Sequence, residues 1–171
     1  MKTSQKLIAG LFASALIMSA GAAEARQGVV KVRGQQGAVT AAKGPNGGGA
    51  IRARGARQNT DGSVTRASGS AYRTPNGGTS VRRSTRTVNP DGSVSRSGAY
   101  NASGARGSID SSGSVYRDAN GNWTGGRSTS ATNAATGNSY QGSTTIDPAT
   151  GKPVHSGACY NSSGDEIACP N

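Results

Sequence analysis

The only side chains in this sequence that could form a nucleophile and base pair are one histidine and two cysteines near the end of the chain. His155 lies four residues before Cys159, and Cys169 follows ten residues later. A thiolate beside an imidazole can act in covalent catalysis, but the second cysteine predicts a disulfide instead. One histidine with two cysteines does not complete a tetrahedral metal site, and CxxC spacing is absent. We therefore expect a structural Cys159–Cys169 bridge.

The carboxylates are placed for structure rather than for acid–base chemistry. Asp61, Asp91, Asp110, Asp118 and Asp147 each stand beside a presumed turn, where aspartate commonly accepts hydrogen bonds from the backbone. The glycines do not open a helix after a strand, as a phosphate-cradling loop requires. The sequence therefore predicts no catalytic, cofactor-binding or metal-binding residues, and we expect a protein that is not an enzyme.

A removable export signal is predicted for residues 1–25. Lys2 and Lys6 flank the start of an apolar run, and the segment ends in Ala23-Glu24-Ala25, which has the form of a cleavage site. The run is short for a membrane span, so no transmembrane segment is expected after the leader is removed. An exported chain can form a disulfide. We expect a protein secreted from the cell or held in the periplasm, as part of the cell envelope.

The composition of residues 26–171 excludes a conventional globular core. This segment contains ten Val and four Ile but no Leu, Met or Phe. So few large apolar side chains cannot offset the conformational entropy lost on folding a thick two-layer domain. Helices are also disfavoured, because Gly, Ser, Thr and Asn dominate and all are poor helix formers. The remaining choices are disorder or thin, repetitive β-structure.

A fifteen-residue repeat favours the β-structure. Turn glycines recur at Gly47, Gly62, Gly77, Gly92 and Gly107, and the spacing loosens afterwards. Most of them follow Asn or Asp, which also tolerate positive φ in tight reversals. Alternating residues follow each turn, typical of half-exposed strands. The pattern predicts an all-β antiparallel hairpin meander, with a β-solenoid as the other geometry and a largely disordered chain as the alternative.

These patterns divide the chain into four parts. A flexible basic arm is expected over residues 26–43, where a poor first strand is the other interpretation, and the β-repeat region over 44–158. The C-terminal loop closed by the disulfide occupies 159–171. Glycines near the middle of the repeats mark either the second corner of a solenoid or bends in long strands. They are Gly55, Gly69, Gly98, Gly113, Gly142 and Gly157.

The basic charge is concentrated in the first half of the repeats. Residues 26–100 carry thirteen Lys and Arg against two Asp. On alternating strands Arg52 and Arg54 share a face, as do Arg82 and Arg86, so rows of guanidinium groups could bind phosphate or carboxylate. The same charge could instead keep the chain soluble and its strand edges apart. The candidate polyanion-binding residues are Arg52, Arg54, Arg57, Arg66, Arg73, Arg82, Arg83, Arg86 and Arg96.

The sequence thus predicts an exported, non-enzymatic β-repeat protein with a structural or adhesive role. Its expected partners are lipopolysaccharide, acidic polysaccharide and extracellular DNA, bound through charge. Aromatic residues are too sparse in the basic half for sequence-specific readout of nucleic acid. The alternative function is a disordered, secreted cationic polypeptide that coats polyanions. Open strand edges would also allow self-association.

Overall fold

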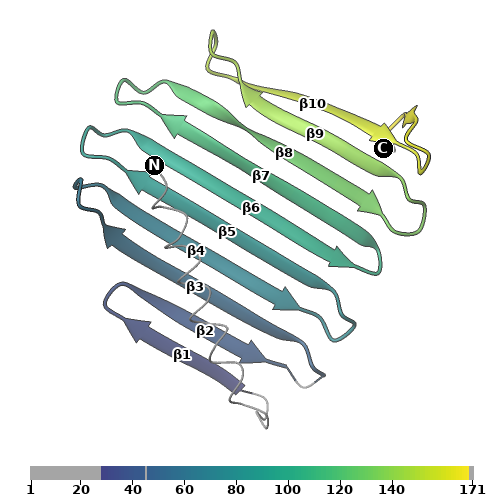
Figure 1. The fold of residues 1–171 in the computed structure, drawn as a ribbon, viewed down its shortest axis with the longest axis horizontal. Helices are drawn as coiled ribbons and strands as arrows, with labels where there is room; N and C mark the ends of the chain where they lie inside the picture. The colour runs from purple at the N-terminus through teal and green to yellow at the C-terminus, as the bar shows by residue number, and fades with distance from the viewer. Residues whose placement is uncertain (1–27, 45, 170–171) are drawn as a thin grey trace.

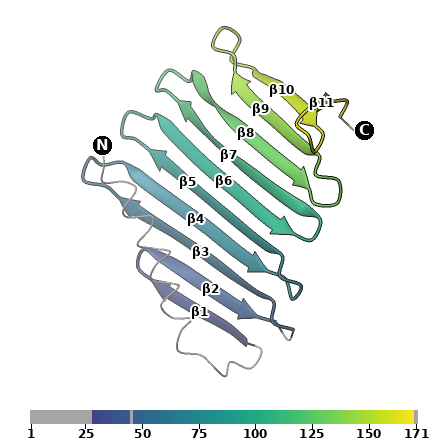
Figure 2. The ribbon, with the colours of Figure 1, turned by 45° about the vertical axis from the view of Figure 1, so that its right-hand side comes forward.

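The computed structural model describes residues 28–44 and 46–169, which form a single antiparallel sheet. The strands follow one another in space in the order in which they occur in the sequence (Figures 1 and 2). They are β1 (Gly28–Gly34), β2 (Gly37–Lys43), β3 (Gly49–Gln58), β4 (Val64–Arg73), β5 (Thr79–Val88), β6 (Val94–Gly104), β7 (Gly107–Arg117), β8 (Trp123–Asn133), β9 (Ser139–Ile146), β10 (Pro153–Tyr160) and β11 (Glu166–Ile167). The predicted hairpin meander is confirmed, and the predicted leader lies outside the described residues.

In most of the described hairpin turns, one glycine takes the positive φ that the reversal requires. In the β3–β4 turn, the Asn59 N–H donates to the Ser63 carbonyl at 2.8 Å and the Gly62 N–H donates to the Asn59 carbonyl at 3.1 Å. Gly62 takes a φ of 80°, and no described residue other than glycine has a positive φ. The turn is therefore a tight turn closed by a glycine bulge. The sequence suggested that the Asn or Asp before a turn glycine would also take a positive φ. None of the described ones does.

The flexible arm predicted for residues 26–43 needs correction, because residues 28–43 form the paired strands β1 and β2. A two-residue turn separates Gly34 from Gly37, which pair with each other. The β-branched residues Val29, Val30 and Val32 favour strand over coil. The other interpretation, a first strand, describes this segment, and the sheet extends beyond the predicted 44–158 region at both ends.

The mid-repeat glycines lie within strands and not at corners. Gly98 pairs with Gly113 across β6 and β7, and Gly142 pairs with Gly157 across β9 and β10. A Cβ at Gly142 or Gly157 would collide with the ring of Tyr140. The aromatic ring thus covers two glycines that have no side chain of their own to pack. These glycines let neighbouring strands and side chains approach closely.

The sheet has almost no apolar interior. Among the described hydrophobic residues, only Ala53, Val94 and Cys159 are buried. Valines and aromatic side chains stay partly in water, with Tyr72 51% and Val30 62% exposed. The strands are therefore stabilised by their hydrogen-bonded ladders, by cross-strand side-chain pairs and by their turns, and not by a second layer.

The turn aspartates predict a loss of stability in acid. The side-chain hydroxyl and then the backbone N–H of Ser63 donate to Asp61 and hold its pKa below the ordinary 3.8. The pKa values of Asp91, Asp118 and Asp147 are lowered by similar turn bonds. A lowered folded-state pKa adds stability above the ordinary pKa, and this stability is lost as the pH falls below it. We expect the thermal midpoint to fall below about pH 4.

The substitution Asp61→Asn tests this expectation, because the amide keeps an acceptor oxygen but does not titrate. Thermal unfolding followed by circular dichroism between pH 6 and pH 2 should show a shallower fall for this variant than for the parent. Glu166→Gln, which removes a carboxylate from a strand and not from a turn, is the control. An equal acid response in Asp61→Asn and the parent would contradict the prediction.

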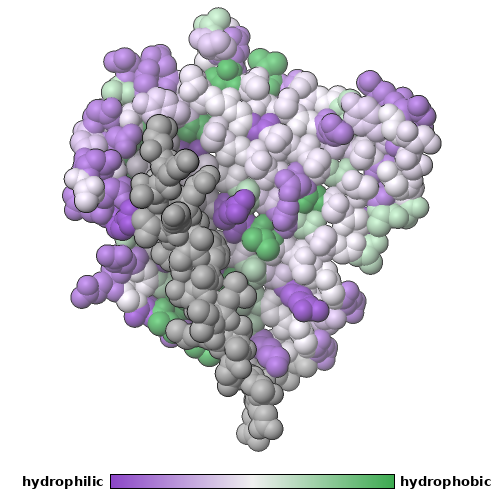
Figure 3. Space-filling model, viewed as in Figure 1, coloured by the Kyte–Doolittle hydropathy of each residue, from purple (hydrophilic) through white to green (hydrophobic). Residues whose placement is uncertain are grey.

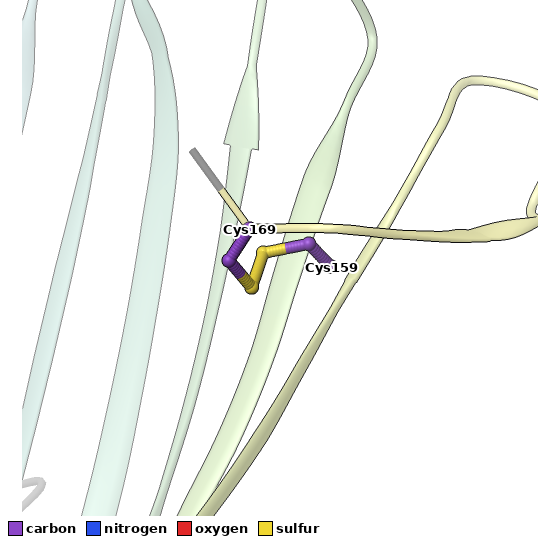
Figure 4. Close-up of a disulfide and its surroundings, with 2 residues drawn as sticks. All are labelled: Cys159 and Cys169. Carbon is purple, nitrogen blue, oxygen red and sulfur yellow. A yellow bond between two sulfur atoms is a disulfide. The ribbon is translucent and has the colours of Figure 1, made fainter. Parts of the chain in front are cut away.

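The C-terminal disulfide is formed as predicted. Cys159 of β10 and Cys169 are bonded, and their Cα atoms lie 5.2 Å apart (Figure 4). The bond ties the segment after β11 back onto β10 at the end of the sheet. Closing a loop of about ten residues stabilises the folded chain by about 2–3 kcal/mol in the chain-entropy account.

The double substitution of Cys159 and Cys169 by serine should therefore loosen one end of the sheet only. Because each described strand is hydrogen-bonded only to its sequence neighbours, we expect faster amide exchange in β10 and β11 and unchanged exchange in β3 to β6. Hydrogen exchange followed by mass spectrometry measures both regions in one experiment. Equal acceleration across all the strands would show that the bridge supports the whole sheet.

Candidate anion-binding face

The strand register gathers most of the basic residues on one face of the sheet. Side chains that are directly paired across strands, or two residues apart within a strand, share a face. Starting from Arg86, this rule places one set of residues together, which we call the basic face. Its basic members are Lys31, Arg33, Arg52, Arg54, Arg66, Arg82, Arg86, Arg96, Arg117 and Arg127.

No carboxylate of the described strands shares the basic face. Asp110 and Glu166 lie on the opposite face, and the other described aspartates stand in turns. Most of the turn aspartates accept hydrogen bonds from residues of their own turn. Asp118, for example, accepts one from the Asn122 backbone N–H at 2.8 Å and one from the Asn122 side chain at 2.9 Å. The arginines of the basic face therefore have no internal counter-charge on that face.

Figure 3 shows the hydropathy of one face of the molecule. In this view the surface over β6 to β9 is mostly pale, and strongly hydrophilic side chains stand out singly. Serine, threonine and glycine make up most of these strands. They add hydroxyl pairs across strands, such as Ser143 with Ser156 at 2.8 Å, but no charge.

Three arginines form a row across neighbouring strands at the centre of the basic face. Arg66 of β4 pairs directly with Arg86 of β5, which pairs with Arg96 of β6. Like charges directly opposite one another are destabilising. Arg86 is half-buried, and its Nε atom is shielded from solvent and has no hydrogen-bond partner among the described residues. The row therefore concentrates positive charge on a face whose described strands hold no carboxylate.

A groove of about 1540 Å³ lies beside this row. Next to the row, the cross-strand line of residues on the basic face is Ser68, Ser84, Gly98 and Gly113, all small. On the far side of that line stand Arg82 and Tyr100, which pair with each other. The groove thus has a floor of serine and glycine, with guanidinium groups on both sides. The residues that line the groove include Arg54, Arg66, Arg82, Arg86, Arg96 and Arg127.

A buried serine holds the arginine at the β8 end of the groove. The Arg127 Nε donates to the Ser111 Oγ at 2.7 Å, and Ser111 is only 3% exposed. The Ser111 hydroxyl also lies 3.0 Å from the Ser128 carbonyl and 2.8 Å from the Thr129 hydroxyl. Arg127 itself is exposed. Its guanidinium group is therefore held in one orientation, and its terminal nitrogens remain available.

The structure separates the sequence-predicted arginines into two groups. Arg52, Arg54, Arg66, Arg82, Arg86 and Arg96 come together on the basic face, whereas Arg57, Arg73 and Arg83 lie on the opposite face. Sequence reasoning missed Lys31, Arg33, Arg117 and Arg127. Arg117 and Arg127 were passed over because the second half of the chain carries little net charge. The alternation of residues along β7 and β8, joined to the register of the turns, is the signal that could have found them.

The cysteines and the histidine form no reactive pair. Cys159 is bonded to Cys169, and the described chain holds no free cysteine. The His155 Nδ1 lies 2.8 Å from the Thr144 hydroxyl on the neighbouring strand. Within the described residues there is no cluster of three or more His, Cys, Asp or Glu that could hold a metal ion.

No helix long and apolar enough to cross a membrane occurs in the described part of the chain. Comparison of the sequence and the structure with family models, with curated proteins and with solved structures gave no match.

Proposed function

We propose that this protein is an exported β-sheet protein of the bacterial envelope or extracellular matrix that binds anionic polymers through its basic face. Its role is structural or adhesive, and it is not an enzyme. The observation that carries the proposal is the separation of charge, with a row of paired arginines on a face whose described strands hold no carboxylate. Guanidinium groups pair well with phosphate and carboxylate.

The partners that fit this face are polymers outside the cytoplasm that repeat an anionic group. Lipopolysaccharide, acidic polysaccharide and extracellular DNA meet this description. The contacts are to repeated charges and not to base edges, so binding is independent of nucleotide sequence. The leader and the disulfide support export, because disulfides persist in oxidising compartments.

The salt dependence of binding tests the proposed function. Three arginine contacts to a single-stranded polyanion correspond to a slope of about −2 in log affinity against log salt, which is roughly a twentyfold loss between 0.05 and 0.2 M salt. Titration of the mature chain with lipopolysaccharide and with linear polyphosphate measures this slope. Affinity that stays constant over this range would exclude charge as the basis of binding and overturn the proposal.

A further inference from the structure

We infer that the groove on the basic face takes a single, unbranched phosphate-bearing chain that runs across the strands. This inference rests on the proposed function and specifies the ligand. The floor residues Ser68, Ser84, Gly98 and Gly113 follow one another from β4 to β7, so the groove runs perpendicular to the strands. A ligand in it crosses one strand at each step and meets an arginine at most of them.

The arginines along the line of the floor residues set the length of the ligand. On this line, Arg33 of β1 lies at one end and Arg127 of β8 at the other, and both line the groove. Seven gaps between neighbouring strands, each about 4.8 Å, separate β1 from β8 and give about 34 Å. Affinity should therefore rise with chain length until an extended ligand spans about 34 Å, and then level off.

The width of the groove admits one chain only. Arg82 and Arg86 stand on opposite sides of the floor and are four residues apart on β5. At about 3.4 Å for each residue, their Cα atoms are about 14 Å apart, and their side chains narrow this space further. A DNA duplex is wider overall than its own major groove, which is about 12 Å across, so it does not fit between the two rows of arginine side chains. A single-stranded chain fits between the two sides.

The arrangement of the arginines favours phosphate over carboxylate. A carboxylate has two oxygens in one plane, and a single guanidinium group can donate a hydrogen bond to each of them. A tetrahedral phosphate presents oxygens in several directions and can accept from both sides of the groove at once. Arg86 and Arg82 face such a group from the two sides, and Arg127 is already oriented by Ser111.

Filling the floor without changing the charge tests the inference. In Gly98→Ile the new Cβ would lie 3.5 Å from the Arg83 carbonyl oxygen and 4.0 Å from the Ser84 Cβ, which are ordinary contacts. Isoleucine also suits a strand better than glycine. The fold should persist while the side chain blocks the middle of the groove. Ser97→Ile, on the adjacent residue and the opposite face, is the matched control.

The probe is linear inorganic polyphosphate, titrated into the full mature chain by calorimetry, with circular dichroism to verify the fold. We expect Gly98→Ile to lower the affinity roughly tenfold, as the loss of one or two contacts would, and Ser97→Ile to leave it within twofold. A polyuronate of equal charge should bind more weakly than polyphosphate.

The outcomes separate this inference from the proposed function. In one outcome, Gly98→Ile binds polyphosphate with the affinity of the parent, whereas the loss of arginines on the basic face weakens binding. The ligand then lies over a diffuse charged surface, and only the groove inference fails. Equal binding of polyuronate and polyphosphate overturns the assignment of phosphate. If the loss of these arginines has no effect either, the proposed function fails as well.

Discussion

Replacing Arg66, Arg86 and Arg96 together by serine should lower the affinity for linear polyphosphate roughly 100-fold at 0.1 M salt, because three contacts to a single-stranded polyanion are lost. The same change should raise the stability of the ligand-free protein. The three guanidinium groups are directly opposed across β4, β5 and β6, and like charges in that position repel each other. Calorimetric titration and thermal unfolding without ligand measure the two effects.

The matched control replaces Arg57, Arg73 and Arg83 by serine, which removes the same net charge from the opposite face. It should weaken binding much less than the substitutions on the basic face. If both triple variants lose affinity equally, the protein responds only to net charge and the basic face has no special role. If loss of the basic row destabilises the free protein, the row contributes to folding rather than to binding.

Replacing Gly107 by alanine should be among the most damaging single changes to the fold that the structure indicates. Gly107 begins β7 with a φ of 137°, a conformation that residues with side chains rarely adopt. A Cβ there would collide with the Thr132 carbonyl oxygen on β8 and lie 3.1 Å from the Ala134 nitrogen. Strain and collision together should cost about 3 kcal/mol or more. This is a large part of the 5–15 kcal/mol typical of a folded domain.

Gly98→Ala is the control, because its Cβ meets nothing closer than 3.5 Å and its φ is ordinary. We expect this variant to match the parent or exceed it in stability, since alanine restricts the unfolded chain more than glycine does. Denaturant unfolding gives the free energies, and hydrogen exchange locates the loss in Gly107→Ala at β7 and β8. Similar stability of the two variants would show that the sheet relaxes around a Cβ at position 107.

Local chemistry was enough to predict the fold. Hairpins could be predicted because Gly47, Gly62, Gly77 and Gly92 recur at a constant interval, and each takes nearly the same φ in the structure. The disulfide could be predicted because the sequence holds only two cysteines, in a chain that its first residues predict to be exported. Both inferences depend on neighbours in the sequence, which a sequence shows directly.

The site was only partly predictable, because it depends on register between strands. Arg82 and Arg83 are adjacent and equally basic, yet they lie on opposite faces. The number of residues in each turn sets which residues of the two strands pair, and therefore on which face each side chain lies. The distribution of charge along the sequence does not show this number. The register also places Arg127 on the line of the groove floor, although the second half of the chain carries little net charge. The first hairpin was missed because it lacks the repeat's glycine spacing.

The sequential order of the strands has a consequence for how such a protein changes over generations. Each unit of about fifteen residues adds one strand and about 4.8 Å of width without disturbing distant parts of the sheet. Gain or loss of two units by unequal recombination leaves the same side chains on each face of the sheet. It changes the width of the sheet by about 10 Å. Duplication of repeats thus changes the length of polymer that the proposed groove accommodates, with no new side-chain chemistry.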